Sequence, residues 1–281
     1  MKLKYNDDSI LQEKNMKPSF DFHLVLVEKI KVEGTDVVSF KFNQLLDKME
    51  KYQTPPLFEY AAGQYAYFNL DDVVGDNKGP TRQFTISSSP TENFIMLSTK
   101  IRSESPYKQR LSTLEVGDKV KASKPEGEFV LPADYSKPII FLSGGIGVTP
   151  FRSIINYTTD KQLPLKITMF DSNKNQQNIL FKKEFDDLAA LNENVKVIYT
   201  LSEEGELSNN NNVSDSEKAW KGEKGRIDKE MILKYVDTDT LNNSTFYICG
   251  PPEMLKSMQS MLEKELEIPK ERIKVEEFTG Y

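Results

Sequence analysis

A glycine-rich turn follows directly after a short apolar run at residues 138–142. An apolar run bounded by turn-forming residues is typical of a buried parallel strand. Glycine has no Cβ and lets the backbone approach a ligand closely, and Thr149-Pro150 predicts the first turn of a helix. A strand, a glycine turn and a helix start together predict a site for nucleotide phosphates, although the same glycines could serve only close packing. The glycines are Gly144, Gly145 and Gly147.

A second group of residues with chemical potential is Arg82, Gln83, Phe84 and Thr85. An arginine can hold a phosphate through two parallel hydrogen bonds. Strand alternation places Phe84 on the same face as Arg82, and Thr85 adds a hydroxyl close by. This combination could grip a flavin: charge for its phosphates, a ring near the isoalloxazine and a hydroxyl near its reactive edge. The alternative is a surface arginine beside a core phenylalanine.

Cys249 follows the apolar residues 246–248 and precedes Gly250-Pro251. A free cysteine in such a run is commonly a small buried residue. The adjoining glycine and proline favour a place near a catalytic centre. A role as covalent nucleophile is not expected, because His23 is the one histidine of the chain and no obvious base accompanies the thiol.

Composition excludes several classes of protein. The chain has 281 residues, 38% of them hydrophobic and 28% charged, which is typical of a globular protein of one large or two ordinary domains. A net charge of -6 argues against a nucleic-acid binder. We find no apolar run long enough for a membrane span and no signal peptide, so we expect a cytoplasmic protein. One cysteine and one histidine exclude a four-cysteine iron-sulfur cluster and a histidine-rich metal site, so we expect redox chemistry to come from an organic cofactor or a partner.

The first part of the chain predicts an antiparallel sheet. Residues 1–20 are polar and aperiodic, and we expect a loosely held extension. A domain over 21–134 then contains short strands separated by turns, which favours a small barrel. Residues 44–60 look like an insertion with a short helical piece. The predicted strands cover 22–27, 37–42, 63–68, 82–87, 94–101 and 119–123.

From residue 135 to 281 strands alternate with helices, which predicts a doubly wound parallel sheet. The break at 203–224 contains an asparagine run and is expected to be a surface insertion. Strands are predicted over 138–142, 165–170, 195–201, 245–248 and 273–278. Helices are predicted over 151–157, 180–191, 229–236 and 252–266.

These motifs together resemble the ferredoxin-NADP reductase superfamily. The glycine turn matches its G-G-x-G-x-T-P pattern, and Gly63-Gln64-Tyr65 followed by Arg82 to Thr85 matches a G-Q-(Y/F) strand and an R-x-Y-(S/T) motif. Further matches are Gly117-Asp118, the P-x-G-x-F segment at 125–129, the C-G-P-x-x-M segment at 249–254 and the E-x-F at 276–278. The order of these matches along the chain argues against coincidence.

The resemblance implies a flavin-binding barrel followed by an NAD(P)-binding domain, with the reaction in the cleft between them. Thr85, Cys249 and Glu276 would be catalytic, with Thr85 near the flavin N5 and Cys249 near the carbon that gives up hydride. Phe84 replaces the commoner tyrosine, and Lys108 stands where the family often has a hydroxyl. The flavin, inferred to be FAD, would contact Arg82, Gln83, Phe84, Thr85, Lys100, Lys108, Phe278 and Tyr281. The nicotinamide dinucleotide would contact Gly144, Gly145, Gly147, Thr149, Ser172, Lys174, Cys249, Gly250 and Pro251.

Two details of these ligand sites are open. Asp171 after a predicted strand favours a ribose diol, whereas Ser172 and Lys174 favour a 2′-phosphate, so we prefer NADPH over NADH. Near the chain end, Phe278 is expected at the flavin edge and Tyr281 as a mobile cover, since Gly280 between them frees the backbone.

The resulting hypothesis is an NAD(P)H-dependent flavoprotein reductase that passes electrons through FAD to a one-electron acceptor in another chain. That acceptor would be a ferredoxin, a flavodoxin or another iron-sulfur protein. A reductase of free flavin or ferric chelates is the first alternative. A non-catalytic electron-relay subunit is the second.

Overall fold

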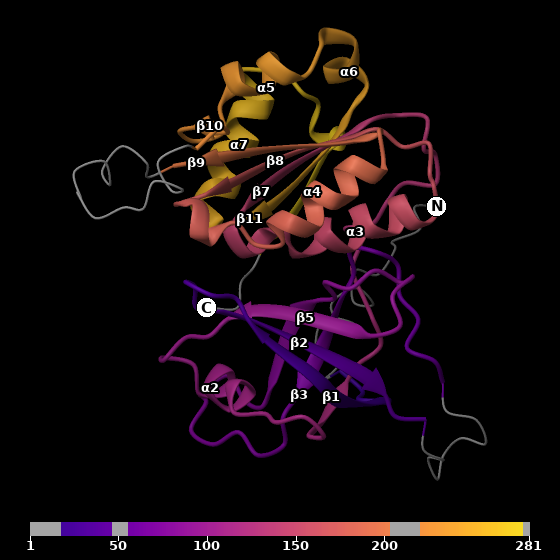
Figure 1. Ribbon diagram of the computed structural model, residues 1–281, viewed down its shortest axis with the longest axis vertical. Helices are drawn as coiled ribbons and strands as arrows, with labels where there is room; N and C mark the ends of the chain where they lie inside the picture. The colour runs from indigo at the N-terminus through magenta and orange to yellow at the C-terminus, as the bar shows by residue number, and fades with distance from the viewer. Residues whose placement is uncertain (1–17, 47–55, 203–219, 278–281) are drawn as a thin grey trace, which may run out of the picture.

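The computed structural model describes residues 18–46, 56–202 and 220–277, which form two halves stacked along the long axis of the molecule (Figure 1). Each half is built on one six-stranded sheet. The proposed division between residues 134 and 135 falls in the connection between the last strand of the first sheet and the first strand of the second. The proposed extension lies outside the described residues up to residue 17.

The first sheet is antiparallel, with the strand order β4-β3-β6-β1-β2-β5. Leu24, Leu26, Phe40 and Phe42 are fully buried at alternate positions of two neighbouring strands, so that one face of the sheet forms the core. Ser87 N, just after β4, donates to a carbonyl of β5 at 2.7 Å and brings the two edge strands together. The predicted antiparallel barrel is confirmed. Its elements are β1 (Phe22–Lys31), β2 (Val37–Gln44), β3 (Tyr65–Asn69), β4 (Thr81–Thr85), β5 (Ile95–Lys100), α2 (Pro106–Ser112) and β6 (Lys119–Ala122).

The second sheet is parallel, with the strand order β10-β9-β8-β7-β11-β12. The chain runs outward from β7 on one side and then returns to β11 on the other, so the strand order reverses beside β7. In open α/β sheets ligands bind at the carboxyl ends of the strands at such a reversal. The strands are β7 (Ile139–Gly144), β8 (Ile167–Asn173), β9 (Val195–Leu201), β10 (Glu223–Lys224), β11 (Thr245–Gly250) and β12 (Ile273–Glu277).

Helices cover both faces of this parallel sheet. Phe141 of β7 packs in one core with residues of α3 and α4, whereas Ile140 and Leu142 pack in another core with residues of α5 and α7. Because neighbouring residues of one strand feed opposite cores, the doubly wound architecture is confirmed. The helices are η1 (Gly145–Val148), α3 (Thr149–Asp160), α4 (Lys182–Leu191), α5 (Lys229–Tyr235), α6 (Thr238–Asn243) and α7 (Pro252–Lys264).

The structure differs from the predicted elements in a few places. Helices α2 and α6 were not predicted, because each has only six or seven residues and few buried side chains. The first helix of the second half begins at Thr149, as the Thr149-Pro150 pair predicted, which is two residues before the range 151–157, and a 3₁₀ turn precedes it. A two-residue strand, β10, lies in the predicted insertion, of which residues 203–219 lie outside the described part. The helical piece predicted after β2 also falls largely outside it, at residues 47–55.

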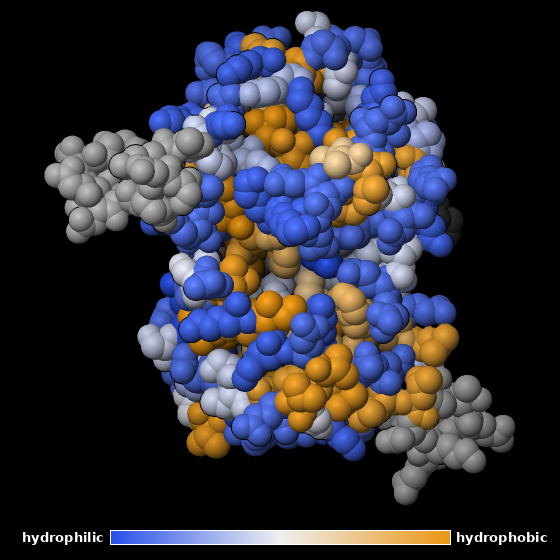
Figure 2. All heavy atoms as spheres, viewed as in Figure 1, coloured by the Kyte–Doolittle hydropathy of each residue, from blue (hydrophilic) through white to orange (hydrophobic). Residues whose placement is uncertain are grey.

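The two halves meet through aromatic residues. The ring of Phe129 lies 5.1 Å from that of Tyr247 in β11 and 5.7 Å from that of Phe151 in α3. The Tyr247 hydroxyl donates to Val130 O at 2.8 Å. A buried apolar interface of this kind favours a fixed arrangement of two domains. The molecular surface narrows between the halves, and apolar side chains are visible at this waist (Figure 2). Among the described residues, no helix combines the length and apolar composition needed to span a bilayer.

Candidate functional site

The larger of two adjoining cavities, here called the β4 cavity, opens between the halves and has a volume of about 310 Å³. Strand β4 supplies most of one wall, and Lys100 and Lys108 stand beside it. Ile146 and Thr149 reach the cavity from the glycine turn and the start of α3 in the other half. The cavity therefore brings together residues that lie in separate sequence motifs. The remaining lining residues are Pro18, Tyr67, Lys78, Thr81, Arg82, Gln83, Phe84, Thr85, Ser98, Thr99 and Glu277.

Thr85 lines the β4 cavity and carries an unused hydroxyl. The residue is 4% exposed, and among the described residues its buried Oγ1 has no hydrogen-bond partner. A buried hydroxyl that lacks a partner carries a desolvation cost, which a ligand with a hydrogen-bonding edge would remove. Phe84, which precedes it, is largely buried and packs with ring centroids 6.0 Å from both Phe68 and Tyr107. Phe84 therefore lines the cavity from within the barrel core.

Arg82 lines the same cavity but is held by its own loop. Its Nη2 contacts Asp76 Oδ1 at 2.5 Å, and the two side chains are 10% and 5% exposed. Its Nη1 donates to the carbonyls of Lys78, Gly79 and Thr81 at 3.3, 2.9 and 2.7 Å. Asp76 also accepts from Tyr107 N at 3.0 Å. Despite partial desolvation, the hydrogen bonds that Asp76 accepts from Tyr107 and Arg82 hold the pKa of its carboxyl below the usual value. The loop thus fixes the direction of the guanidinium.

Lys108 adds a buried ammonium to this wall. Desolvation lowers the pKa of Lys108 to about 8, and the neighbouring charges of Arg102 and Arg82 contribute to this lowering. A group of cations around one concavity suits a multiply charged anion such as a diphosphate. Sequence reasoning selected Arg82 and Lys108 but missed Asp76 and Lys78. These two come from a polar loop without a distinctive pattern, and only their spacing from Arg82 could have indicated them.

The second cavity, here called the glycine-turn cavity, has a volume of about 190 Å³. Lys100 and Ile146 line both cavities, so that the two sites adjoin. Five residues that the sequence predicted for the nicotinamide dinucleotide line this second cavity: Gly144, Gly145, Ser172, Lys174 and Pro251. Thr149, predicted for the same ligand, lines the β4 cavity instead. Residues that sequence reasoning missed complete the wall: Thr35, Asp36, Val37, Asn173, Asn178, Leu180, Ser202 and Met254.

The glycines of the turn occupy their positions for different structural reasons. A Cβ on Gly147 would lie 2.3 Å from Cys249 O, so close packing of the turn on β11 requires glycine there. A Cβ on Gly144 would lie 2.2 Å from the sulfur of Met254. Gly145 has a φ of +56° and faces open space, which leaves its backbone accessible to a ligand. Gly147 and Gly250 thus support the cavity from behind and do not line it.

Cys249 and Glu276 are paired in register on β11 and β12. Cys249 is fully buried, and burial together with the nearby Glu276 raises the pKa of its thiol well above the usual value. Burial raises the pKa of Glu276 to about 7. Neither residue lines the two cavities, although Glu277 lines the β4 cavity. The thiol therefore stays neutral beneath the glycine turn.

Asp171, the acid weighed for coenzyme choice, is fully buried. Its Oδ2 accepts from the Asn173 side chain at 2.8 Å, and burial raises the pKa of its carboxyl to about 6. The Asp171 carboxyl is buried near the C-terminal ends of β7 and β8, whereas Ser172 and Lys174 line the cavity. Phe278 and Tyr281 lie outside the described residues.

Several known proteins are similar to this chain in sequence. Residues 141–260 match the family model of the oxidoreductase NAD-binding domain. Flavohemoprotein A of Dictyostelium discoideum is 27% identical over 263 residues, which cover 90% of this chain and 59% of that protein. A component of the Na(+)-translocating NADH-quinone reductase of Shewanella denitrificans is 27% identical over 245 residues, covering 83% of this chain and 57% of the relative. The chain thus spans less than two thirds of the length of these relatives.

Solved structures share the fold. The flavohem-like FAD/NAD binding domain of nitric oxide dioxygenase from Vibrio cholerae has a TM-score of 0.71 at 20% identity, covering 92% of this chain and 98% of that one. A mutant ferredoxin-NADP+ reductase from Plasmodium falciparum has a TM-score of 0.68 at 20% identity, with coverages of 91% and 95%. The chain thus shares its two-domain fold with these structures, and its second half matches the oxidoreductase NAD-binding domain.

Proposed function

We propose that this chain is an NAD(P)H-dependent flavoprotein reductase that passes electrons through FAD to a one-electron acceptor protein. The observation that carries this proposal is the junction of the two cavities at Lys100 and Ile146, between an antiparallel barrel and a parallel sheet. Ligands in the two cavities would approach each other there. The protein contributes position and environment, and a bound flavin supplies the chemistry of accepting a hydride and releasing electrons singly.

The residues of the β4 cavity fit a flavin dinucleotide. Arg82, Lys78 and Lys108 offer positive charge for its phosphates, while Phe84 and Tyr67 offer apolar surface. The Thr85 hydroxyl, buried and without a partner among the described residues, would hydrogen-bond the reactive edge of the ring system. The Vibrio cholerae domain that shares the fold is described as FAD/NAD binding, which supports FAD over FMN.

The residues of the glycine-turn cavity fit a nicotinamide dinucleotide. Gly145 leaves its backbone accessible just after β7, where the turn leads into α3. Ser172 and Lys174 line the outer wall and support NADPH as the preferred coenzyme. Their hydroxyl and ammonium groups suit a 2′-phosphate better than an acid would, and the nearby Asp171 is fully buried.

Catalytic roles are proposed for Thr85, Cys249 and Glu276. Thr85 would orient the flavin edge by a hydrogen bond. The neutral Cys249 thiol would support the turn below the nicotinamide carbon that releases hydride. Because the pKa of Glu276 is raised to about 7 by burial, its carboxyl holds a proton at neutral pH for part of the time. We propose that this carboxyl exchanges a proton near the reacting groups.

The acceptor is proposed to be a small one-electron carrier such as a ferredoxin, a flavodoxin or another iron-sulfur protein. A bound iron-sulfur cluster commonly needs four cysteine thiolates, and these 281 residues contain one cysteine. Electrons that leave the flavin singly therefore need a carrier outside these residues. The resemblance to a mutant ferredoxin-NADP+ reductase in fold supports a carrier of this class.

The test begins with purified protein incubated with FAD or FMN and freed of excess cofactor. We expect retention of FAD and reduction of ferredoxin or flavodoxin with NADPH. Faster reduction of free flavin or ferric chelates than of either protein would favour the alternative reductase. Protein that retains neither flavin would contradict the proposal.

A further inference from the structure

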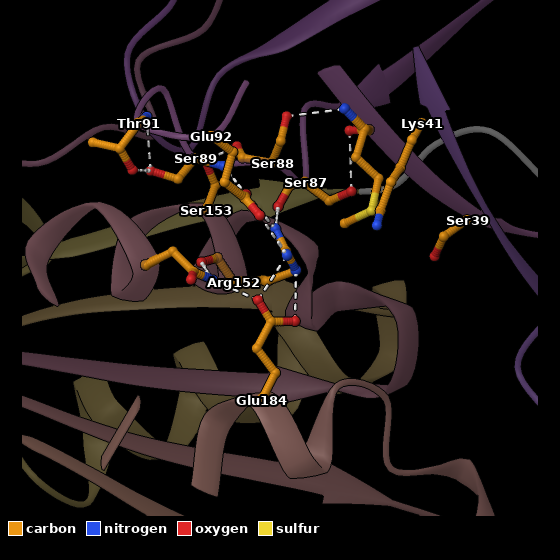
Figure 3. Close-up of polar contacts among 12 residues, drawn as sticks. Ser39, Lys41, Ser87, Ser88, Ser89, Thr91, Glu92, Arg152, Ser153 and Glu184 are labelled. Atoms are coloured by element: carbon orange, nitrogen blue, oxygen red, sulfur yellow. Dashed lines mark hydrogen bonds and ion pairs between the residues drawn. The ribbon is translucent and has the colours of Figure 1, made fainter. Parts of the chain in front are cut away.

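An ionic network with a buried arginine at its centre joins the two halves. Its centre is Arg152 of α3, which is 5% exposed and lines neither the β4 cavity nor the glycine-turn cavity. Glu92 contributes from the loop after β4, and Glu184 contributes from α4. The close-up shows the guanidinium between the two carboxylates, with the serines of the loop above it (Figure 3).

Every N–H of the Arg152 guanidinium has an acceptor. Nη1 donates to Glu92 Oε2 at 2.8 Å and Nη2 donates to Glu92 Oε1 at 3.0 Å. Nε donates to Glu184 Oε2 at 2.9 Å, and Nη2 contacts Glu184 Oε1 at 2.6 Å. The second proton of Nη1 is directed to the backbone carbonyl of Ser87 at 2.7 Å. An arginine has five N–H donors in a fixed planar arrangement, so this geometry leaves it little freedom.

The contacts of Arg152 divide into two kinds. Those to Ser87 and Glu92 cross from the second half to the first, whereas those to Glu184 stay within the second half. Ser153, the next residue of α3, adds a crossing contact, because its Oγ donates to Ser88 O at 2.5 Å. The hydrogen bonds between the guanidinium and the two carboxylates are charge-assisted, so they are stronger than hydrogen bonds between neutral groups.

The contacts of the network lie close in the chain to residues that line the cavities. Ser87 lies two residues after Thr85, and Arg152 lies three residues after Thr149, so each end of the network is adjacent to a residue of the β4 cavity. Thr149 also ends the glycine turn that lines the second cavity. Residues three apart on a helix lie on the same side, about one turn from each other. A displacement of the network would therefore move the wall of the β4 cavity that contains Thr85 relative to the wall that contains Thr149.

We propose that Arg152 is a positioning residue that locks the loop at residues 87–92 to α3 and thereby sets the distance between the two ligands. This inference rests on the proposed reductase function. Hydride transfer requires reacting atoms about 3 to 3.5 Å apart, and a displacement of about 1 Å can cost about 100-fold in rate. Loss of the crossing contacts should slow hydride transfer without removing either ligand.

The test uses Glu92→Gln, which weakens the crossing arm, and Glu184→Gln, which weakens the arm within one half. Asp160→Asn is the matched control, because Asp160 at the far end of α3 accepts from Thr91 in the same loop, at an exposed place. Flavin-loaded proteins are mixed anaerobically with saturating coenzyme, and the single-turnover rate of flavin reduction is recorded. We expect about a tenfold to 100-fold slower rate for Glu92→Gln and less than about twofold for the other two variants.

Three further readouts separate positioning from general damage. Flavin content, the coenzyme Kd and oxidation of dithionite-reduced flavin by ferricyanide should stay unchanged in Glu92→Gln. In cofactor-free protein, hydrogen exchange should rise in Glu92→Gln both at residues 87–92 and at the start of α3. Glu184→Gln should raise exchange only in α3 and α4.

A Glu92→Gln protein with the parent reduction rate and the parent exchange pattern would overturn the inference. If the parent protein itself is not reduced by either coenzyme, the proposed function fails. Hydrogen exchange in the cofactor-free variants then still decides whether the network joins the halves. Arg152→Lys and Arg152→Met provide a second pair of variants. The lysine ammonium should retain part of the flavin-reduction rate that Arg152→Met loses.

Discussion

The β4 cavity is lined by charged and aromatic side chains, whereas the glycine-turn cavity includes a turn of glycines in its wall. In the first, Arg82 and Lys108 bring charge into a largely buried wall. In the second, Gly145 leaves its backbone accessible, and Gly147 lets the turn pack against β11. Removing side chains should therefore damage the first cavity most. Adding a single carbon atom should damage the second.

Gly147→Ala should have the largest effect. Its Cβ would lie 2.3 Å from Cys249 O and 2.7 Å from Gly250 Cα, so the turn must shift. We expect the free energy of unfolding to fall by about 3 kcal/mol. Flavin reduction by coenzyme should be slower by about 100-fold. Chemical denaturation and stopped-flow absorbance measure the two effects.

Gly145→Ala is the matched control for this change. Gly145 has a φ of +56° with no heavy atom within 4 Å of an added Cβ, so its cost is backbone strain of about 1 kcal/mol. Equal destabilisation by both alanines would show that contact with β11 does not distinguish the two glycines.

Arg82→Ala should give the second largest effect. A charge-assisted phosphate contact is worth about 1.5 to 3 kcal/mol, which corresponds to about a tenfold to 100-fold higher flavin Kd. Flavin content after gel filtration and a fluorescence titration measure it. Arg110→Ala is the control, because Arg110 pairs with Asp72 at 2.8 Å in an exposed part of the same half. A variant at position 82 that holds flavin as tightly as the parent would remove Arg82 from the site.

The pH dependence of flavin binding should give a smaller effect. Lys108 has a pKa lowered to about 8 by burial, so its ammonium is charged below pH 8 and neutral above it. A phosphate is bound better by the charged form, so flavin affinity should fall several-fold as pH rises through this pKa. Lys108→Met should bind flavin more weakly at neutral pH and lose this pH dependence. The same slope in parent and variant would assign the titration to another group.

Coenzyme choice should give the smallest effect. With NADPH and NADH compared in steady-state kinetics, Lys174→Ala should lower the preference for NADPH by about fivefold or less, as expected for an exposed charge. Lys161→Ala, at an exposed position outside both cavities, should leave the ratio unchanged. A clear preference of the parent for NADH would reverse the predicted coenzyme.

The fold could be predicted from the sequence because the patterns that indicate it are local. Apolar alternation in β1 and β2 and the glycine turn after β7 are each readable within a short stretch of chain. Arg82 was selected by residue type and strand alternation, and Lys108 through the resemblance to the reductase superfamily. Sequence reasoning missed Asp76, which holds Arg82, and Arg152, whose partners are 60 and 32 residues away, because only the fold brings these residues together. Helix α6 was missed because it is short and buries only Leu241.

Burial also changed how two selected residues are understood. From the sequence, Asp171 is an acid that would favour a ribose diol, yet its carboxyl is enclosed and bound by Asn173. Cys249 reads as a residue facing the ligand, yet it lies beneath the glycine turn and packs against it through its carbonyl. The direction of a side chain at the end of a strand depends on packing of neighbouring strands, which a single sequence does not contain.

An anaerobic titration tests the central claim of two ligands meeting in adjoining cavities. Protein loaded with FAD is titrated with NADPH or NADH while the flavin absorbance is recorded. We expect the flavin to be bleached fully by about one equivalent of coenzyme, since a hydride carries both electrons that a flavin accepts. A bound flavin that dithionite reduces but neither coenzyme reduces would contradict the account.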